Sequence, residues 1–272
     1  MRSESPVFRS VPLARSARVL AGAVLFVVVI APGAAAWGPT GHRAVGRIAE
    51  RHLTPRAAQA VRELLGPEQL AYVTTWADEI RSEPDGARAE AWHWVTIPDG
   101  QTYESSAKNP AGDVVEAIAR FEKVLTDGTA DREARVRAVK WLSHLIGDLH
   151  QPLHVGRSDD HGGNDVLVLW FGEPTNLHAV WDSKIIEHSQ LSFSELAELV
   201  DHPTPEQVRQ WQASRAPEWA RESEDLRDAC YSMGDRRLSY LYIHDHWPAV
   251  QRRILQAGVR LAGELNRLLA PQ

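Results

Sequence analysis

The chain has 272 residues, of which 43% are hydrophobic, and its 12 histidines and 10 tryptophans are high numbers for this length. Its formal net charge of −6 argues against a protein that coats nucleic acid through a basic surface. Cys230, the one cysteine in the sequence, excludes an internal disulfide, so stability must come from packing or from bound metal.

The first 36 residues have the pattern of a secretory signal peptide. Four arginines precede a short apolar run at 19–30, and the small residues 34–36 suit a cleavage site. A membrane anchor is disfavoured, because the run is too short to span a bilayer comfortably and ends in Pro-Gly-Ala. Removing this leader, which carries four Arg and one Glu, leaves 236 residues with a net charge of −9. We therefore expect a secreted or periplasmic protein with a single domain over residues 37–272.

The apolar spacing after residue 37 is helical nearly throughout. Thr54 caps a segment that has Pro55 in its first turn and stops at Gly66. Further helices are expected at 113–126, at 131–150, after the capping signals at Ser192 and Thr204, and at 247–269. Two segments, 93–98 and 165–171, have the composition of strands. The sequence thus predicts an all-α fold, a single mainly helical domain with a small β-hairpin-like element.

The strongest chemical signal is the stretch HLIGDLHQPLH at 144–154. His144 and Asp148 are four residues apart on a predicted helix and so share one face. Pro152 stops this helix just before His154. Imidazole and carboxylate together suit zinc. Asp148 could instead be a surface acid, but its neighbours are apolar, and a carboxylate beside a buried face needs a partner.

A second pair, His178 and Asp182, has the same spacing behind Asn176, which is a suitable helix cap. An ion pair on a solvated helix face would also have this spacing. The repetition of the pair in one chain makes that alternative weaker.

Asp78 and His93 are weaker candidates when each is taken alone. Asp78 lies among apolar residues with Arg81 one turn on, a pattern more typical of an ordinary helix acid beside an arginine. His93 lies between Trp92 and Trp94, where a buried core histidine is more common than a metal ligand.

Other histidines are not assigned to the site. His150 lies two residues after Asp148, off the metal-facing stripe, and is expected to be exposed or to cap the helix. His161 is expected to be a solvated loop residue, and His244 and His246 lack a third ligand nearby in the sequence.

Five short motifs follow one another between residue 37 and about residue 190. They are WGPTGH (37–42), WADEIR (76–81), WHWV (92–95), HLIGDLHQPLH (144–154) and NLHAVWD (176–182). In this order and spacing they resemble the zinc-dependent single-strand nucleases, the family of mung bean nuclease, its fungal relatives and the plant bifunctional nucleases. Bacterial zinc phospholipases C share that fold more distantly.

The resemblance implies a cleft with three zinc ions, beside which the small β-element would lie. The nine implied ligands divide by ion: Asp78, His93 and His144 for the first, Trp37 and His42 for the second, Asp148 as a bridge between these two, and His154, His178 and Asp182 for the third. Trp37 would bind through a free α-amino group and its own carbonyl oxygen, which requires cleavage directly before it.

The resemblance also implies a zinc-dependent endonuclease. It would hydrolyse single-stranded DNA and RNA to 5′-mononucleotides through a metal-activated hydroxide, and it would have 3′-nucleotidase activity. Asp148 and Arg81 would be catalytic, Arg81 by stabilising charge on the phosphate, and Trp94 would stack on an unpaired base unless it is a core aromatic. We expect single-stranded nucleic acid and nucleotides as partners, no stable membrane association, and a monomer.

This sequence departs from the family's pattern at two places. Thr96 and Ile97 occupy the stretch where fungal and plant members usually carry an acid, and the nearest acid here is Asp99. Ser183 stands where some members have asparagine. Base preference and the proton-handling residue therefore stay open, and the missing disulfide cysteines favour a bacterial type of enzyme.

Two other functions stay open from the sequence. One is a zinc phospholipase C that acts on phospholipid head groups, although Trp94 and Arg81 suit a nucleotide better and no exposed apolar stripe suggests membrane binding. The other is a non-catalytic periplasmic protein that stores zinc. Storage needs no open coordination positions, whereas nine ligands for three ions would leave such positions.

Overall fold

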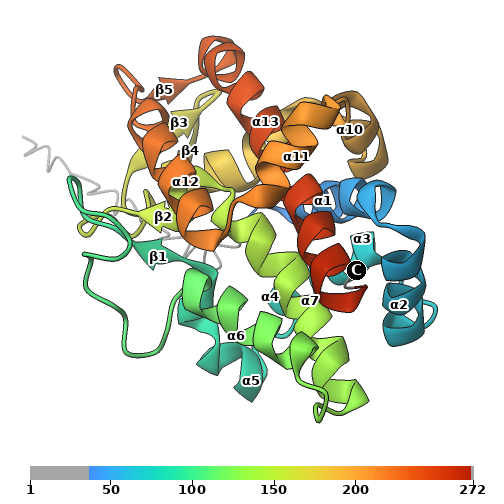
Figure 1. Cartoon of the computed structure of the whole chain (residues 1–272). Coiled ribbons are helices and arrows are strands. Elements are labelled where there is room, and N and C mark those ends of the chain that lie inside the picture. Colours follow the sequence, from blue (N-terminus) through green and yellow to red (C-terminus); the bar gives the residue numbers. More distant parts are fainter. Residues whose placement is uncertain (1–36, 271–272) are drawn as a thin grey trace, which may run out of the picture. The chain divides into compact units, whose positions relative to one another are not determined.

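Helix α13 (Tyr240–Leu269) packs along α1 (Pro39–His52) in the middle of the helical part of the molecule (Figure 1). The computed structural model describes residues 37–270, and all of these belong to one compact unit. At Gly258 the two helices are so close that a Cβ atom would lie 2.5 Å from Cβ of Ile48. The absent side chain lets α13 approach α1 closely.

The predicted helices are present, with the caps that the sequence indicates. α2 (Pro55–Leu65) begins after Thr54, whose hydroxyl accepts a hydrogen bond from the backbone of Ala57. Both predicted capping boxes are formed, one before α10 (Phe193–Val200) and one before α11 (Pro205–Ala213). The predicted segments 113–126 and 131–150 correspond to α6 (Val114–Thr126) and α7 (Arg132–Leu149).

Helix α13 begins earlier than predicted. The segment predicted from the sequence begins at residue 247. The structure starts the helix at Tyr240 and holds Pro248 inside it. Packing of α13 against its neighbours outweighs the cost of an interior proline.

Short elements join the long helices, and several of them carry candidate ligands. They are α3 (Leu70–Val73), α4 (Trp76–Glu79), α5 (Pro84–Arg88), η1 (Glu90–His93), η2 (Pro152–His154), α8 (Leu177–Ala179), η3 (Val180–Lys184) and α9 (Ile185–His188). A longer helix, α12 (Ala216–Cys230), follows α11 in the chain.

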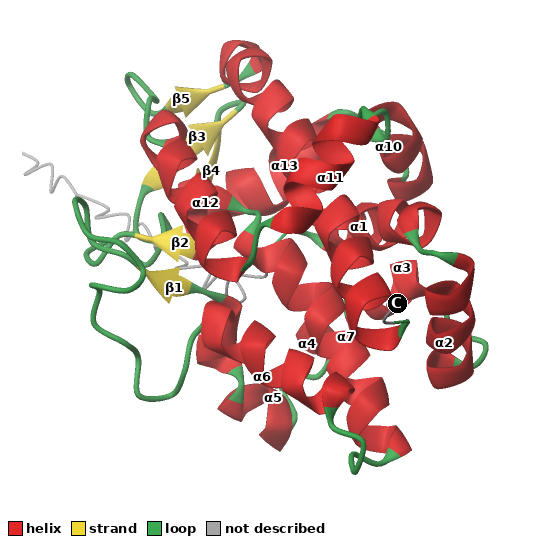
Figure 2. Ribbon diagram, viewed as in Figure 1, coloured by secondary structure: helices red, strands yellow, loops and turns green. Residues whose placement is uncertain are grey.

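The strands form two small sheets at one side of the helices (Figure 2). β1 (Val95–Thr96) pairs in parallel with β2 (Val155–Gly156). β3 (Leu167–Trp170) pairs antiparallel with β4 (Glu173–Asn176) and in parallel with β5 (Arg237–Leu238). The all-α prediction with a small hairpin is confirmed, but the two strands read from the sequence lie in different sheets. Their partner strands β2 and β5 have only two residues each and β4 is polar, so none of them shows the alternation of a strand.

A buried polar network closes the carboxyl end of α7. The hydroxyl of Ser223 donates to the carbonyl of Leu149 (2.6 Å), and Nε of Arg253 donates to the carbonyl of His150 (3.1 Å). Arg253 and Arg260 are both buried and both pair with Glu222. Helices end with carbonyls that lack an intrahelical partner, and side chains of α12 and α13 supply those partners here.

His150 corrects one expectation. The sequence predicts that His150 is either exposed or a helix cap. It is the C-cap residue of α7, and it is fully buried. Its Nδ1–H donates to the carbonyl of Ile146 (2.7 Å), and its Nε2 lies 2.9 Å from a guanidinium nitrogen of Arg260. Burial and the charges of Arg253 and Arg260 hold its pKa well below the usual value, so it is a neutral part of the network.

The predicted leader, residues 1–36, lies outside the described residues. Gly38 is the N-cap of α1 and Pro39 its first residue, so His42 lies in the first turn of a helix. Within residues 37–270, no helix is long and apolar enough to cross a membrane.

Candidate metal centre

Asp148 lies fully buried between three imidazoles. Its Oδ1 is 3.2 Å from Nε2 of His42, and its Oδ2 is 2.9 Å from Nδ1 of His93 and 3.2 Å from Nε2 of His144. The two oxygens therefore face different imidazoles, an arrangement that lets one carboxylate contact two cations at once. We call Asp148, its three histidines and Asp78 the Asp148 cluster.

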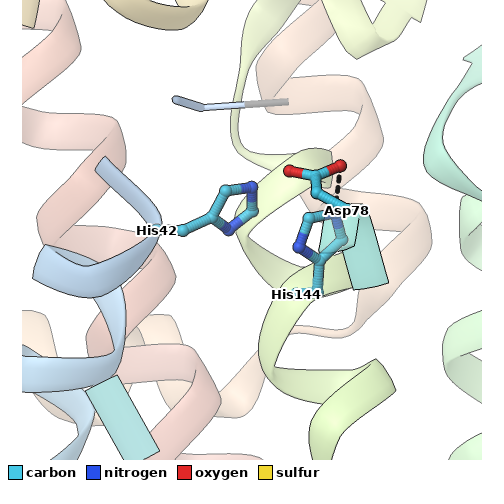
Figure 3. Close-up of side chains that lie close together, drawn as sticks. All are labelled: His42, Asp78 and His144. Carbon is cyan, nitrogen blue, oxygen red and sulfur yellow. Dashed lines mark ion pairs between the residues drawn. The ribbon is translucent and has the colours of Figure 1, made fainter. Parts of the chain in front are cut away.

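Asp78 completes this cluster from a separate element. Figure 3 shows His42 on α1, His144 on α7 and Asp78 on α4 converging. The rings of His42 and His144 are stacked, with centroids 4.1 Å apart. Oδ1 of Asp78 is 3.7 Å from Nε2 of His144. The family resemblance assigns His42 and Asp78 to different ions, whereas the structure groups His42 with Asp78 and His144, and His144 with His93 and Asp148. All five residues thus meet in one cluster.

His154, His178 and Asp182 form a second cluster, which we call the Asp182 cluster. Nε2 of His178 lies 3.1 Å from Nε2 of His154 and 3.3 Å from Oδ2 of Asp182. All three residues are buried. The predicted cap at Asn176 is formed, because its side chain accepts from the backbone of Ala179 at the start of α8. The structure therefore brings together the predicted third set.

Backbone carbonyls fix the tautomer of three histidines. The Nδ1–H of His144 donates to the carbonyl of Thr74 (2.7 Å). In the same way, the Nδ1–H of His154 donates to the carbonyl of His93 (2.6 Å), and that of His178 donates to the carbonyl of Gly162 (2.7 Å). A carbonyl only accepts, so in each neutral ring Nε2 carries the lone pair. Oriented imidazoles of this kind are typical of metal ligands, whose second nitrogen binds a protein acceptor.

The donor atoms require a cation between them. The Nε2 lone pairs of His154 and His178 face each other at 3.1 Å, which is repulsive unless a proton or a metal ion lies between. Burial lowers the pKa of both rings and so opposes the proton. Within residues 37–270, both ring nitrogens of His42, Oδ1 of Asp78 and Oδ1 of Asp148 are buried and make no well-aligned hydrogen bond. Their charged or polar neighbours lie close, since Oδ1 of Asp148 is 3.2 Å from Nε2 of His42 and Oδ1 of Asp78 is 3.1 Å from Nε of Arg81. These nitrogen and carboxylate donors fit zinc.

In the metal-free protein, bound protons supply part of the positive charge that these donor atoms need. Burial disfavours charged His144, but the carboxylates of Asp148 and Asp78 outweigh burial and raise its pKa to about 9. Burial would raise the pKa of Asp148, yet the charge of His144 and hydrogen bonds from the imidazoles lower it. Burial lowers the pKa of His42 to about 4 and raises that of Asp182 to about 8. Charge is costly at each buried position unless a counter-charge lies beside it.

Arg81 lies at the edge of both clusters. Its Nε is 3.1 Å from Oδ1 of Asp78. Burial is the main cause of the lowered pKa of His93, His154 and His178, and the charge of Arg81 adds to the lowering at each of them. The Arg81 side chain is 27% exposed, so a solvent-borne anion can reach it.

Trp94 reaches the surface directly beside His93. It is 37% exposed, so Trp94 is not the core aromatic residue that the sequence left as an alternative. The neighbouring Trp92 is instead packed edge-on against Phe121 and Trp141. Successive side chains of an extended segment point to opposite sides, so Trp94 lies on the outer face of the segment that leads from His93 into β1.

The main chain at Trp37 and Gly38 lies beside the Asp182 cluster. The backbone N–H of Gly38 donates to the carbonyl of Asp182 (2.6 Å). The indole of Trp37 is fully buried, and its Cβ lies so close to Gly41 that a Cβ there would be 2.8 Å away. The main chain at the predicted cleavage point is thus fixed by a backbone bond to one predicted ligand.

The histidines left out of the site lie outside both clusters. His161 is exposed in its loop and pairs with Asp165. His244 and His246 belong to α13, where His246 packs against the rings of Trp181 and Tyr242.

Gln151 is a contact residue of the site for which the sequence predicted no role. It is fully buried, and its side chain donates to Oδ1 of Asp182 (2.6 Å). Its position inside HLIGDLHQPLH was the available signal. The carbonyls of Thr74 and Gly162 could not be predicted as acceptors for the histidines, because every residue type has a backbone carbonyl.

Comparison with known proteins agrees with this geometry. The family model described as S1/P1 Nuclease matches residues 37–270. Endonuclease 3 of Arabidopsis thaliana is 33% identical, over 94% of this chain and 96% of its own length. Nuclease S1 of Aspergillus oryzae is 27% identical, over 87% of this chain and 92% of its own length. Nuclease P1 of Penicillium citrinum is 31% identical over 58% of this chain and 63% of its own length.

Proposed function

The chain belongs to the S1/P1 nuclease family, and we propose that it hydrolyses single-stranded DNA and RNA to 5′-mononucleotides and also removes 3′-phosphates from nucleotides. Membership makes it a hydrolase of phosphodiester bonds in nucleic acids. The substrate range and the residue roles below are our proposal.

One observation carries this proposal: two adjacent clusters of His and Asp side chains, all buried except the partly exposed Asp78, lie beside an arginine that solvent reaches. We assign three zinc ions to them, with His42, Asp78, His93, His144, Asp148 and the main chain of Trp37 around two ions, and His154, His178 and Asp182 around the third. Bound zinc supplies Lewis acidity, which polarises phosphate oxygens and makes water more acidic.

The remaining chemistry falls to the chain's own side chains. Arg81 binds a phosphate oxygen with charge-assisted hydrogen bonds and stabilises the charge that develops on it. Asp148 acts as the shared ligand that holds the two sides of its cluster together, through its two differently oriented oxygens. Trp94 offers an exposed ring for one base. Stacking on such a ring favours unpaired nucleotides, because bases in a duplex already stack on one another.

We further propose that residues 1–36 are a signal peptide and that 37–272 form one secreted or periplasmic catalytic domain, acting as a monomer. The buried side chain of Trp37 and the bond from Gly38 to Asp182 support a mature chain that begins at Trp37. A free amine at that residue becomes available as a ligand only after cleavage.

The proposal is tested with the mature protein, zinc analysis and a substrate panel. We expect about three zinc ions per chain, cleavage of denatured DNA and of RNA, little cleavage of duplex DNA, and release of phosphate from a 3′-nucleotide. Cleavage of a phosphatidylcholine analogue without cleavage of nucleic acid would instead support the phospholipase alternative. Zinc binding with no hydrolysis of any substrate would support the storage alternative.

A further inference from the structure

Gln151 links two segments that carry predicted ligands of the Asp182 cluster. It lies between the end of α7 and η2, three residues before His154. Its amide reaches η3, where it donates to Oδ1 of Asp182 at 2.6 Å. The same amide accepts a hydrogen bond from the backbone of Leu153, also at 2.6 Å, as the N-cap of η2.

These two contacts fix which way the amide points. A backbone N–H can only donate, so the group that faces Leu153 must be the oxygen of Gln151. The nitrogen then faces Asp182, and a carboxylate is the acceptor that it requires. With Gln151 fully buried, turning the amide round would leave two unfavourable contacts in a site without solvent.

The hydrogen bond also selects the orientation of the carboxylate. Oδ1 of Asp182 accepts from Gln151, while Oδ2 lies 3.3 Å from Nε2 of His178. Oδ1 lies 3.8 Å from Nε2 of His154, beyond hydrogen-bond distance. The oxygen that is not held by Gln151 is therefore the one directed at the lone pair of His178.

We propose that Gln151 is a positioning residue for the third zinc ion: it holds Asp182 so that Oδ2 faces the ion shared with His154 and His178. The inference rests on the zinc site proposed above. Gln151 gives Asp182 the same support that the carbonyls of His93 and Gly162 give to the two histidines of that cluster. Partners of this kind typically change metal affinity 10- to 100-fold when they are removed.

The test is zinc titration of the metal-free mature protein with Gln151→Met, which keeps the length of the side chain and removes both hydrogen bonds. Gln256→Met is the matched control, because Gln256 is also a buried glutamine in a hydrogen bond, here from Arg253 of the network that closes α7. We expect one of the three zinc ions to bind about 10- to 100-fold more weakly in Gln151→Met, and all three to bind normally in Gln256→Met.

Melting curves of both variants, with and without zinc, separate positioning from general destabilisation. We expect both metal-free variants to melt below the metal-free wild type, while the rise on adding zinc shrinks in Gln151→Met alone. Unchanged affinity for all three ions in Gln151→Met would overturn the assignment, and so would equal weakening in both variants. These readouts do not use hydrolysis, so a wild type that binds zinc but cuts no nucleic acid would refute the proposed function and leave the role of Gln151 standing.

Discussion

A Cβ atom on Gly147 would lie 2.8 Å from Nδ1 and 2.9 Å from Cε1 of His42. Glycine at this position of α7 therefore gives the imidazole from α1 the space that it occupies. Gly147 immediately precedes Asp148, so the same turn of α7 supplies both the carboxylate and the space for its histidine partner.

Replacing Gly147 by alanine should weaken zinc binding at the Asp148 cluster without unfolding α7. Alanine is the better helix former by roughly 1 kcal/mol, but its methyl group would displace a fully buried ring that has little room to move. Metal analysis after dialysis checks this, with Gly128→Ala as control because nothing lies within 4 Å of a Cβ there. Full zinc occupancy in Gly147→Ala would contradict the argument.

Replacing Arg81 by alanine should leave zinc content unchanged and lower kcat about 100- to 1,000-fold, the usual effect of losing one charge-stabilising donor. Arg81 pairs with Asp78 but binds no predicted ion itself. The measurement is kcat on a single-stranded oligonucleotide, together with metal analysis. Arg137→Ala serves as control, since this arginine pairs with Asp85, outside both clusters. Turnover at the wild-type rate in Arg81→Ala would refute its assignment.

Replacing Trp94 by alanine should raise KM and spare kcat. Loss of a stacked base costs about 1–3 kcal/mol, which corresponds to roughly a 5- to 150-fold rise in KM. Tyr72→Ala is the matched control, because Tyr72 is also an exposed aromatic side chain but packs against Phe193, a residue of α10. An equal KM for Trp94→Ala and wild type would show that the base stacks elsewhere.

Retaining Ala36 in front of Trp37 should cost one zinc ion and most of the activity. The extra peptide bond turns the α-amino group into an amide, which has no lone pair available for a metal. Mass spectrometry confirms the amino terminus, and metal analysis gives the count. One alanine added after Gln272 is the control, and three ions bound by the Ala36-extended protein would contradict a role for the free amine.

Replacing Glu222 by glutamine should destabilise the protein at neutral pH by about 3 kcal/mol, because two buried arginines lose their counter-charge. Burial would raise the pKa of Glu222, but hydrogen bonds from Arg260 and Arg253 and their charges outweigh it and lower the pKa below 4.5. The depressed pKa means that this stabilisation is fully present above pH 4.5 and is lost as the pH falls through the folded-state value.

Urea denaturation of the metal-free protein across the acid range checks this pH dependence. The difference in unfolding free energy between wild type and Glu222→Gln should be constant above pH 4.5 and shrink below it. Asp225→Asn is the control, since Asp225 makes a surface pair with Arg221 and such pairs contribute little. A difference that grows toward acid would show that the network is not held by an ionised carboxylate.

Local sequence patterns predict most of the helices and two of the His–Asp pairs of the candidate site. Local rules were sufficient for Thr54, for the two capping boxes and for the end of α7 before Pro152, because caps and stops depend on neighbours within a few residues. The spacing of four between His144 and Asp148, and between His178 and Asp182, placed each pair on one face for the same reason.

The contacts that those helix faces make depend on the tertiary structure. It brought Asp78 and His93 to Asp148 and showed that Trp94 is exposed while Trp92 is packed. It buried His150 against the arginines of α13 and gave Gln151 a carboxylate partner 31 residues away in the chain. Whether a polar side chain is solvated or buried depends on which distant segment covers it, and no local pattern of residues contains that information.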